Sequence, residues 1–270
     1  MNFKNYLKII AVIATIATSA GWFHVFTRPT PPSRYEVAQS KVVLLIVPDG
    51  QGTGIVIKRR DSLGRERVFL WTAAHVMGKF TEAKVKINIR NEGKKVGETD
   101  FTASLIAKDE KIDVALLYVV GAPGSYFSGN EFDSIVPLHV GAPLYHVGNF
   151  FGDMLDGSFS KGVVSQIGAF PKTGKLGFWP VLDQSTFTIE RGSSGGPVFN
   201  DKDDKVVGIA VGKTGEVSFY VPVRAVDSFA TSKGLAWAVY GNKCPISIPL
   251  APSIIPIPAD IELFKLGFTD

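Results

Sequence analysis

The sequence predicts an all-β protein built from two six-stranded antiparallel β-barrels, preceded by an N-terminal hydrophobic helix. The chain contains many short runs rich in Val, Ile and Phe, several of which alternate apolar and polar residues, and it has 28 glycines. Its 270 residues are enough to bury a complete hydrophobic core. Two closed barrels are expected because closure removes the sheet edges that such short strands would otherwise expose.

Residues 1–27 have the pattern of a signal anchor or a signal peptide. Two lysines precede an apolar run over residues 9–26, and no acidic residue occurs before Glu36. A helix of about 18 residues is about 27 Å long, close to the ~30 Å hydrocarbon core of a membrane. Thr18-Ser19-Ala20 offers a cleavage site, whereas the aromatic residues at the far end of the run favour an uncleaved single-pass anchor. We therefore expect a membrane-tethered bacterial protein with its body on the non-cytosolic side, in the envelope or periplasm, or a secreted protein if the segment is cleaved.

The remaining chain divides into a linker, a folded domain and a tail. Residues 28–40 contain three prolines and are expected to form a stiff linker. The folded domain is expected over 41–235, with one barrel over about 41–133, a second over about 134–222, and a C-terminal helix over 223–233. The expected strands are 41–47, 54–57, 68–71, 84–89, 101–106, 114–120, 144–147, 159–166, 178–183, 197–199, 206–211 and 217–221. The region 121–133 is interpreted as a connector, and 236–270 as a Pro/Ile-rich tail.

Charge and cysteine content argue against several classes of function. The net charge is +4, and the basic residues are interspersed with acidic ones, so no nucleic-acid partner is expected. The single cysteine, Cys244, excludes an intrachain disulfide. The four histidines have no ligand-like spacing to it, so neither a metal site nor another cofactor is expected.

The segment from Arg191 to Pro197 has the pattern of a nucleophile turn. Glycine lacks a Cβ atom, so two backbone N–H groups can point into one small space beside a serine hydroxyl. That space can hold the oxyanion of an acyl-transfer intermediate, with Ser194 Oγ as the attacking atom. Gly-Ser-Ser-Gly-Gly is equally typical of a flexible turn, so the interpretation depends on finding a base and a carboxylate elsewhere.

Two upstream positions could supply these groups. His75 follows the small residues Thr72-Ala73-Ala74 at the end of an expected strand, and Asp113 directly precedes a wholly apolar strand. Taken singly, each has an ordinary alternative, a structural histidine or a turn aspartate. A carboxylate at the edge of a core needs a hydrogen-bonded partner, which a histidine N–H would provide. The order His, Asp, Ser, with the first two in one barrel, makes nucleophilic catalysis the favoured hypothesis.

These motifs resemble those of the trypsin/chymotrypsin clan of serine proteases, and more closely its cysteine-poor branch of HtrA-like and Trypsin_2-type domains. The resemblance covers roughly residues 43–227. The matching segments are Gly52-Thr53-Gly54-Ile55-Val56-Ile57, Thr72-Ala73-Ala74-His75, Asp113-Val114-Ala115-Leu116-Leu117, Gly148-Asn149-Phe150-Phe151-Gly152, Gly162-Val163-Val164-Ser165, Gly192-Ser193-Ser194-Gly195-Gly196-Pro197 and Val207-Gly208-Ile209-Ala210. It implies a chymotrypsin-like fold and a serine endopeptidase that hydrolyses polypeptides through an acyl-enzyme.

The resemblance also implies roles for individual residues. His75, Asp113 and Ser194 would form the triad, and the backbone N–H groups of Gly192 and Ser194 the oxyanion hole. The pocket for the residue preceding the cut would be bordered by Thr188, Ile189, Ala210, Val211, Gly212 and Lys213. No acidic residue stands at the expected pocket floor, so we expect a small or medium apolar residue there.

Two departures from the family pattern bear on regulation. Ser193 replaces the aspartate that pairs with a freed amino terminus in digestive members, so no such zymogen switch is implied. The residues after Asp227 are too few for a PDZ domain. Two other readings remain open: a catalytically silent, membrane-tethered binding module with this fold, and a viral protease matured from a polyprotein. The sequence does not indicate an oligomeric state.

Overall fold

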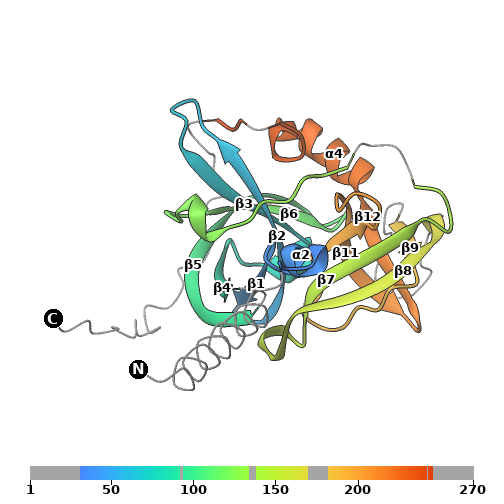
Figure 1. The fold of residues 1–270 in the computed structure, drawn as a ribbon. Coiled ribbons are helices and arrows are strands. Elements are labelled where there is room, and N and C mark those ends of the chain that lie inside the picture. The colour runs from blue at the N-terminus through green and yellow to red at the C-terminus, as the bar shows by residue number, and fades with distance from the viewer. Residues whose placement is uncertain (1–30, 92–93, 134–137, 170–181, 242, 246–270) are drawn as a thin grey trace, which may run out of the picture.

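The computed structural model describes residues 31–91, 94–133, 138–169, 182–241 and 243–245, which form two closed antiparallel barrels (Figure 1). The strand order around the first barrel is β1-β2-β3-β6-β5-β4, and around the second it is β10-β11-β12-β9-β8-β7. The first comprises β1 (Val42–Val47), β2 (Gly50–Arg60), β3 (Glu66–Thr72), β4 (Glu82–Asn91), β5 (Lys94–Asp109) and β6 (Val114–Val119). The second comprises β7 (Pro143–Phe150), β8 (Leu155–Ala169), β9 (Leu182–Ser185), β10 (Pro197–Asn200), β11 (Val206–Thr214) and β12 (Val217–Pro222).

The predicted all-β architecture of two six-stranded barrels is therefore confirmed. The predicted N-terminal hydrophobic helix, with the apolar run 9–26, lies outside the described residues, as does most of the strand expected over 178–183. Within the described part of the chain, no helix is long and apolar enough to cross a membrane. Several strands, such as β5 and β8, extend beyond the predicted ranges because the antiparallel pairing of their hairpins continues past the alternating core segments.

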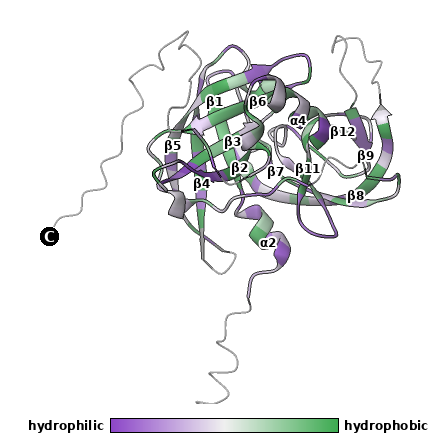
Figure 2. Cartoon of the chain, turned by 90° about the horizontal axis from the view of Figure 1, so that it is seen from above, coloured by the Kyte–Doolittle hydropathy of each residue, from purple (hydrophilic) through white to green (hydrophobic). Residues whose placement is uncertain are grey.

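Helices occupy the margins of the barrels. They are α2 (Arg34–Gln39), α3 (Ala74–Met77), α4 (Val223–Ser232) and the 3₁₀ turns η1 (Gly124–Tyr126), η2 (Gly152–Met154) and η3 (Ala236–Ala238). The predicted C-terminal helix is present as α4, one residue shorter than expected. Seen from above, α2 lies outside the strands, which carry hydrophobic and hydrophilic residues in alternation (Figure 2).

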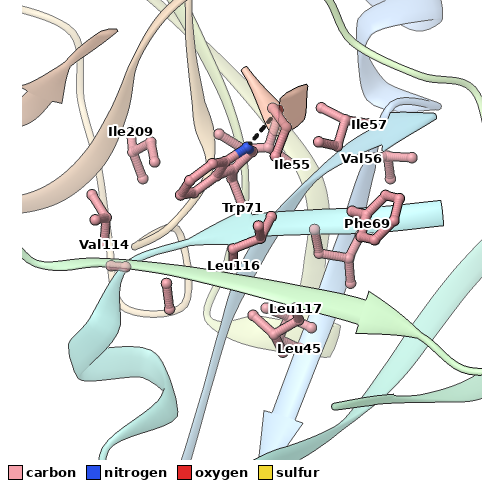
Figure 3. Packing of buried hydrophobic residues seen from close by; sticks show 14 of the residues in the cluster. Leu45, Ile55, Val56, Ile57, Phe69, Trp71, Val114, Leu116, Leu117 and Ile209 are labelled. Atoms are coloured by element: carbon pink, nitrogen blue, oxygen red, sulfur yellow. Dashed lines mark hydrogen bonds between the residues drawn. The ribbon is translucent and has the colours of Figure 1, made fainter. Parts of the chain in front are cut away.

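A fully buried tryptophan, Trp71 on β3, organises the core of the first barrel (Figure 3). Its ring packs edge-on against Phe132 of the connector and Phe229 of α4, with centroids 6.4 and 6.2 Å away. Its indole N–H donates a 2.9 Å hydrogen bond to the carbonyl of Ala238 in η3. The connector and the C-terminal segment are thus fastened to the same side chain that fixes β3, the strand leading to His75.

Two predicted boundaries need correction. The linker expected up to residue 40 contains α2, which begins with a capping box: Ser33 Oγ accepts the Glu36 backbone N–H, and the Glu36 carboxylate accepts the Ser33 N–H. The tail expected from residue 236 begins with folded chain, because buried Arg59 on β2 donates to the carbonyls of Trp237, Ala238 and Val239. A buried guanidinium needs such acceptors, so these contacts hold the segment against the first barrel.

Candidate active site

His75 lies on α3, the single helical turn that follows β3. Its side chain is 45% exposed, and its Nδ1 lies 2.7 Å from Asp113 Oδ2. An ionised carboxylate only accepts hydrogen bonds, so Nδ1 carries the proton and Nε2 keeps its free lone pair. The imidazole is therefore oriented with its basic nitrogen away from the carboxylate.

Asp113 ends the turn between β5 and β6, and its side chain is only 4% exposed. Its second oxygen, Oδ1, accepts the backbone N–H of His75 at 2.8 Å. Its φ of +58° lies in the left-handed region, which aspartate tolerates better than most residues. Backbone strain of this kind is found at functional sites, and here it directs the carboxylate toward α3.

The nucleophile turn, residues 191–197, precedes and begins β10. Gly192 and Gly195 both have positive φ, at +89° and +87°. A residue with a side chain would be strained at such a φ, and it would also lack space at either position. A Cβ on Gly192 would lie 2.3 Å from the Asn149 carbonyl, and one on Gly195 would lie 2.1 Å from Thr72 Oγ1. Glycine is thus required at both positions by conformation and by space.

The peptide planes of this turn leave two N–H groups open. The Arg191 carbonyl accepts the Phe151 N–H at 2.5 Å, and in a trans peptide the next N–H, that of Gly192, points the opposite way. Within the described part of the chain, neither the Gly192 N–H nor the Ser194 N–H donates to a protein acceptor. These are the two donors that the resemblance assigns to the oxyanion hole.

The two adjacent serines differ in their contacts. Ser193 is fully buried; its hydroxyl donates to the Glu190 carbonyl at 2.6 Å and accepts the Glu190 N–H at 3.0 Å. Ser194 is partly exposed, and its hydroxyl makes only a long, 3.4 Å hydrogen bond to the Val211 carbonyl. Among the described residues no hydrogen bond joins Ser194 to His75, although both line one cavity. Ser193 therefore stabilises the turn, and Ser194 is the hydroxyl available to a substrate.

That cavity has a volume of about 550 Å³ and lies between the two barrels. Besides His75, Gly192 and Ser194 it is lined by the β1–β2 turn, by the segment after His75, and by Arg191. These further residues are Val47, Asp49, Gly50, Gln51, Val76, Met77, Gly78, Lys79 and Phe80. None of the six residues expected to border the substrate pocket lines this cavity.

The six expected pocket residues have different surroundings. Ile189 and Ala210 are buried in the core of the second barrel. Val211 is buried as well and presents its carbonyl to Ser194. The remaining three are at least partly exposed: Thr188, Gly212 and Lys213. Lys213 forms an ion pair with Glu190, just before the nucleophile turn. Of the six, only Thr188 and Lys213 combine a side chain beyond Cα with an exposed position, while the assignment of the pocket itself stays a prediction.

A small hydrogen-bond network outside the nucleophile turn supports its backbone, and its residues were not predicted to have this role. Buried Thr53 on β2 donates from Oγ1 to the Gly192 carbonyl and from its backbone N–H to the Ser194 carbonyl, both at 2.8 Å. Buried Asn149, in a bulge of β7, donates its N–H to Thr53 Oγ1 at 2.9 Å. Both lie inside matched motifs, but nothing in their residue types marks them as supports of the turn.

Among the described residues, the other two histidines, His139 and His146, do not approach the serine as a base would; His24 lies outside the described residues. His139 is exposed. His146 on β7 is fully buried, stacked against Phe150 and Phe187 with centroids 6.1 and 5.4 Å away. Its Nδ1 donates to the Pro197 carbonyl at 2.9 Å, and burial lowers the pKa of this imidazole to about 4. Within the described ranges its Nε2 has no hydrogen-bond partner. His146 is thus a neutral packing residue beneath the turn.

In the described ranges no group of three His, Cys, Asp or Glu side chains could hold a metal ion.

Comparison with known proteins agrees with this geometry. Residues 52–209, more than half of the chain, match the family described as trypsin-like peptidase domain. The chain is 35% identical over 124 residues to a probable periplasmic serine endoprotease DegP-like of Rickettsia prowazekii, a match that covers 46% of this chain. It is 27% identical over 188 residues to a serine protease HtrA-like of Staphylococcus aureus, which covers 66% of it. In both cases the chain spans 23% of the relative's length.

Solved structures show the same fold. A mutant of Rv3671c from M. tuberculosis, in an inactive form, superposes with a TM-score of 0.55 at 22% identity, covering 77% of this chain and 95% of the other. Deg5 superposes with a TM-score of 0.56 at 18% identity, covering 78% and 97%. The double barrel, the ordered motifs and the family match lead to one conclusion: the chain belongs to the trypsin-like peptidase family.

Proposed function

We propose that this protein is a serine endopeptidase that hydrolyses peptide bonds in polypeptides with Ser194, His75 and Asp113 as its triad. The observation that carries the proposal is the doubly hydrogen-bonded pair of His75 and Asp113, whose histidine lines the same cavity as the partly exposed Ser194. Such a pair prepares a histidine for proton transfer.

The reaction begins when the Ser194 hydroxyl turns from the Val211 carbonyl toward His75 Nε2. Catalytic hydrogen bonds are often long before substrate binds, so the 3.4 Å contact is compatible with this movement. Ser194 Oγ attacks the peptide carbonyl while His75 takes its proton. His75 then protonates the leaving amine, and the acyl-enzyme forms. A water molecule hydrolyses the acyl-enzyme by the same steps, and Asp113 stabilises the imidazolium each time.

The negative charge on the attacked oxygen is stabilised by backbone donors. The open N–H groups of Gly192 and Ser194 support their assignment as the oxyanion hole. One such donor typically contributes about 3 kcal/mol to lowering the barrier. The orientation of the Arg191–Gly192 peptide therefore contributes to the rate alongside the triad, although a change in the triad itself is expected to cost more.

Substrate would cross the site with its two sides in different surroundings. The residue before the cut would lie near Thr188, Gly212 and Lys213. We still propose that a small or medium apolar residue is preferred there. The residues after the cut would enter the cavity of about 550 Å³, where Phe80 offers an apolar wall and Arg191 a positive charge. Cleavage-site profiling with a peptide library tests both parts; a basic preference before the cut would contradict the first.

We further propose that the domain acts outside the cytosol, tethered by residues 9–26 or secreted after their removal. The apolar run behind two lysines supports this, and one relative is described as periplasmic. Fractionating cells that express the full chain, and sequencing the mature amino terminus, distinguishes an anchored protein from a cleaved one. A soluble cytosolic protein that starts at Met1 would contradict both.

A catalytically silent member of the family is the second candidate. The contact of the Ser194 hydroxyl with Val211 rather than with His75 favours it. A fluorophosphonate probe, which reacts with activated serines, separates the two. The wild type should be labelled, Ser194→Ala should not, and Ser193→Ala should still be labelled, because the Ser193 hydroxyl is buried in local hydrogen bonds. A folded wild-type protein that is never labelled, and that releases no peptides from casein, would refute the enzyme proposal.

A further inference from the structure

Helix α2 lies before β1 in sequence but docks on the second barrel. Tyr35 packs against Phe159 of β8, with ring centroids 4.6 Å apart, and edge-on against Tyr145 of β7 at 5.4 Å. Lys161 of β8 donates to the Tyr35 hydroxyl at 2.6 Å. Arg34 binds the Asp201 carboxylate in the β10–β11 turn. Since β1 belongs to the first barrel, α2 connects the two barrels.

One side chain of α2 forms a hydrogen bond with the first residues of β8. The amide of Gln39, the last residue of the helix, donates a 2.7 Å hydrogen bond to the Gly157 carbonyl on β8. Gly157 is buried and has a φ of +67°, so its two peptide planes are set by this conformation. Gln39 therefore fixes the start of β8 where the chain leaves the loop after β7.

The next step passes from Gly157 to Asn149. The Gly157 N–H donates to Asn149 Oδ1 at 3.1 Å, and Asn149 Nδ2 donates to the Val43 carbonyl at 3.0 Å. With these bonds, both polar atoms of the buried Asn149 amide have partners inside the protein. Asn149 occupies the bulge opposite Gly157, and a bulge of this kind turns a side chain out of the regular strand pattern.

Two branches run from Asn149 to the oxyanion turn. In the first, the Asn149 N–H donates to Thr53 Oγ1, which donates in turn to the Gly192 carbonyl. In the second, the backbone after Asn149 presents the Phe151 N–H to the Arg191 carbonyl. Phe151 does so with a φ of +55°, a conformation that the surrounding bonds must maintain. Together the branches fix both carbonyls that flank the Gly192 N–H.

We propose that Gln39 is a positioning residue for peptide hydrolysis, which sets the Gly192 N–H through the relay Gln39–Gly157–Asn149–Thr53–Gly192. Docking of α2 on the second barrel thereby tunes the oxyanion hole. The inference rests on the proposed function, since it assigns a role within that same site. Gln39 contacts no substrate, and its influence is transmitted by hydrogen bonds that each hold a backbone carbonyl or a buried amide.

The test uses the full chain and the second-order rate of labelling by a fluorophosphonate, whose phosphoryl oxygen needs the same donors. Gln39→Glu keeps the size of the side chain but removes its N–H donor, and should slow labelling about fivefold. Val37→Ala, at a 40% exposed position on the same helix, is the matched control and should label as the wild type does. The thermal midpoint of both variants should stay close to that of the wild type. On a casein-derived peptide, the loss should lie in kcat with KM unchanged, because the oxyanion exists only near the transition state.

A double-mutant cycle separates the relay from a general effect of the helix. Thr53→Val removes the hydroxyl that links Asn149 to Gly192, whereas Thr53→Ser retains it. Gln39→Glu should slow labelling in the Thr53→Ser background by about the same factor as in the wild type, and by a smaller factor in the Thr53→Val background, where only the branch through Phe151 remains. Equal slowing in both backgrounds, or no slowing in the wild type, would overturn the relay. If Thr53→Val does not fold, an unchanged kcat in Gln39→Glu would still do so. Each of these results leaves the enzyme proposal intact, because that proposal fails only if the wild type is not labelled.

Discussion

The two halves of the proposed active site are held in place by different means. His75 and Asp113 both come from the first barrel, and two hydrogen bonds of 2.8 and 2.7 Å join them directly. Ser194 stands on a turn of the second barrel whose shape depends on neighbours outside the turn. Thr53 reaches it from the first barrel and Phe151 from the loop after β7.

This difference indicates where each half is vulnerable. The acid–base half should fail when one of its two side chains is changed, because few other groups contribute to it. The nucleophile half should fail through backbone changes at a distance, because its function requires peptide planes rather than side chains. Each of the following experiments can break or sharpen this contrast.

The largest effect is expected from Asp113→Asn. An amide at this position can donate to His75 Nδ1, which shifts the imidazole proton to Nε2 and removes the lone pair that would accept the serine proton. In a comparable triad such a change lowers kcat about 10⁴-fold, and we expect a loss of that order in hydrolysis of a casein-derived peptide. Glu110→Gln is the control, since Glu110 is an exposed carboxylate that forms an ion pair with Lys108. Retention of a tenth of the wild-type rate by a folded Asp113→Asn protein would contradict the role of Asp113.

Gly192→Ala tests the nucleophile half without touching a catalytic side chain. The added Cβ would lie 2.3 Å from the Asn149 carbonyl, so the turn must move and the Gly192 N–H with it. Loss of one oxyanion donor typically lowers kcat about 10²- to 10³-fold, and we expect that range here.

Gly215→Ala is the matched control for backbone strain. Gly215 also has a positive φ, +58°, but a Cβ there would meet nothing within 4 Å. This variant should lose about 1 kcal/mol of stability and keep its activity. Equal losses of kcat in the two variants would show that strain alone, and not the position of the oxyanion donor, accounts for the effect.

Low pH should lower the free energy of unfolding through His146, whose ring lies next to Ser193 and Gly196 in the nucleophile turn. Its pKa is about 4 in the folded protein, while the unfolded chain binds the proton at about 6.5. Between about pH 6.5 and pH 4, His146 is therefore protonated in the unfolded chain but neutral in the folded protein. Stability from this residue is fully present above about pH 6.5 and declines by about 3 kcal/mol as the pH falls to about 4.

The measurement is the free energy of unfolding in urea at several pH values between 7 and 4. His146→Gln, which is neutral at every pH and retains an N–H donor for the Pro197 carbonyl, should lose part of this dependence. The remaining decline belongs to other groups, such as Asp61. Desolvation raises the pKa of this carboxyl, but hydrogen bonds from Arg65, Arg67 and the Leu63 backbone together outweigh it and lower the pKa to about 2. An identical pH profile in the wild type and His146→Gln would contradict the assignment.

The contrast between the halves also explains what the sequence could predict. The twelve-strand architecture followed from alternating runs and turn residues, because both are local signals. His75, Asp113 and Ser194 could be proposed because their neighbours are unusual: small residues before the histidine, an apolar strand after the aspartate, and glycines around the serine. Ser33 and Glu36 also carry a local signal, the capping box of α2, although the prolines just before it are more typical of a linker.

The supports of the nucleophile turn could not be predicted in the same way. Thr53, Asn149 and Gln39 are ordinary residues whose roles arise from contacts between segments 96, 118 or 139 positions apart in the chain. The same holds for Arg59, whose buried guanidinium binds carbonyls of the C-terminal segment. The burial of Ile189 and Ala210 in the core of the second barrel could not be predicted for the same reason, because it depends on strands that are distant in sequence.

The smallest effect is expected from Lys213→Ala, which tests whether Lys213 borders the pocket for the substrate residue before the cut. Lys213 and Glu190 have side chains 40% and 31% exposed, and an ion pair of this kind contributes at most about 1 kcal/mol to stability. Removing the lysine leaves the Glu190 carboxylate beside the expected pocket without its cation. We expect a less than threefold change in kcat/KM for peptides with an apolar residue before the cut, and a relative gain for peptides with Lys or Arg there. Lys79→Ala, which breaks an exposed pair with Asp49 on the cavity side, should not produce this shift. If both peptide series respond alike to Lys213→Ala, Lys213 does not border the pocket, and specificity must reside with Thr188, Gly212 or the cavity beyond the cut.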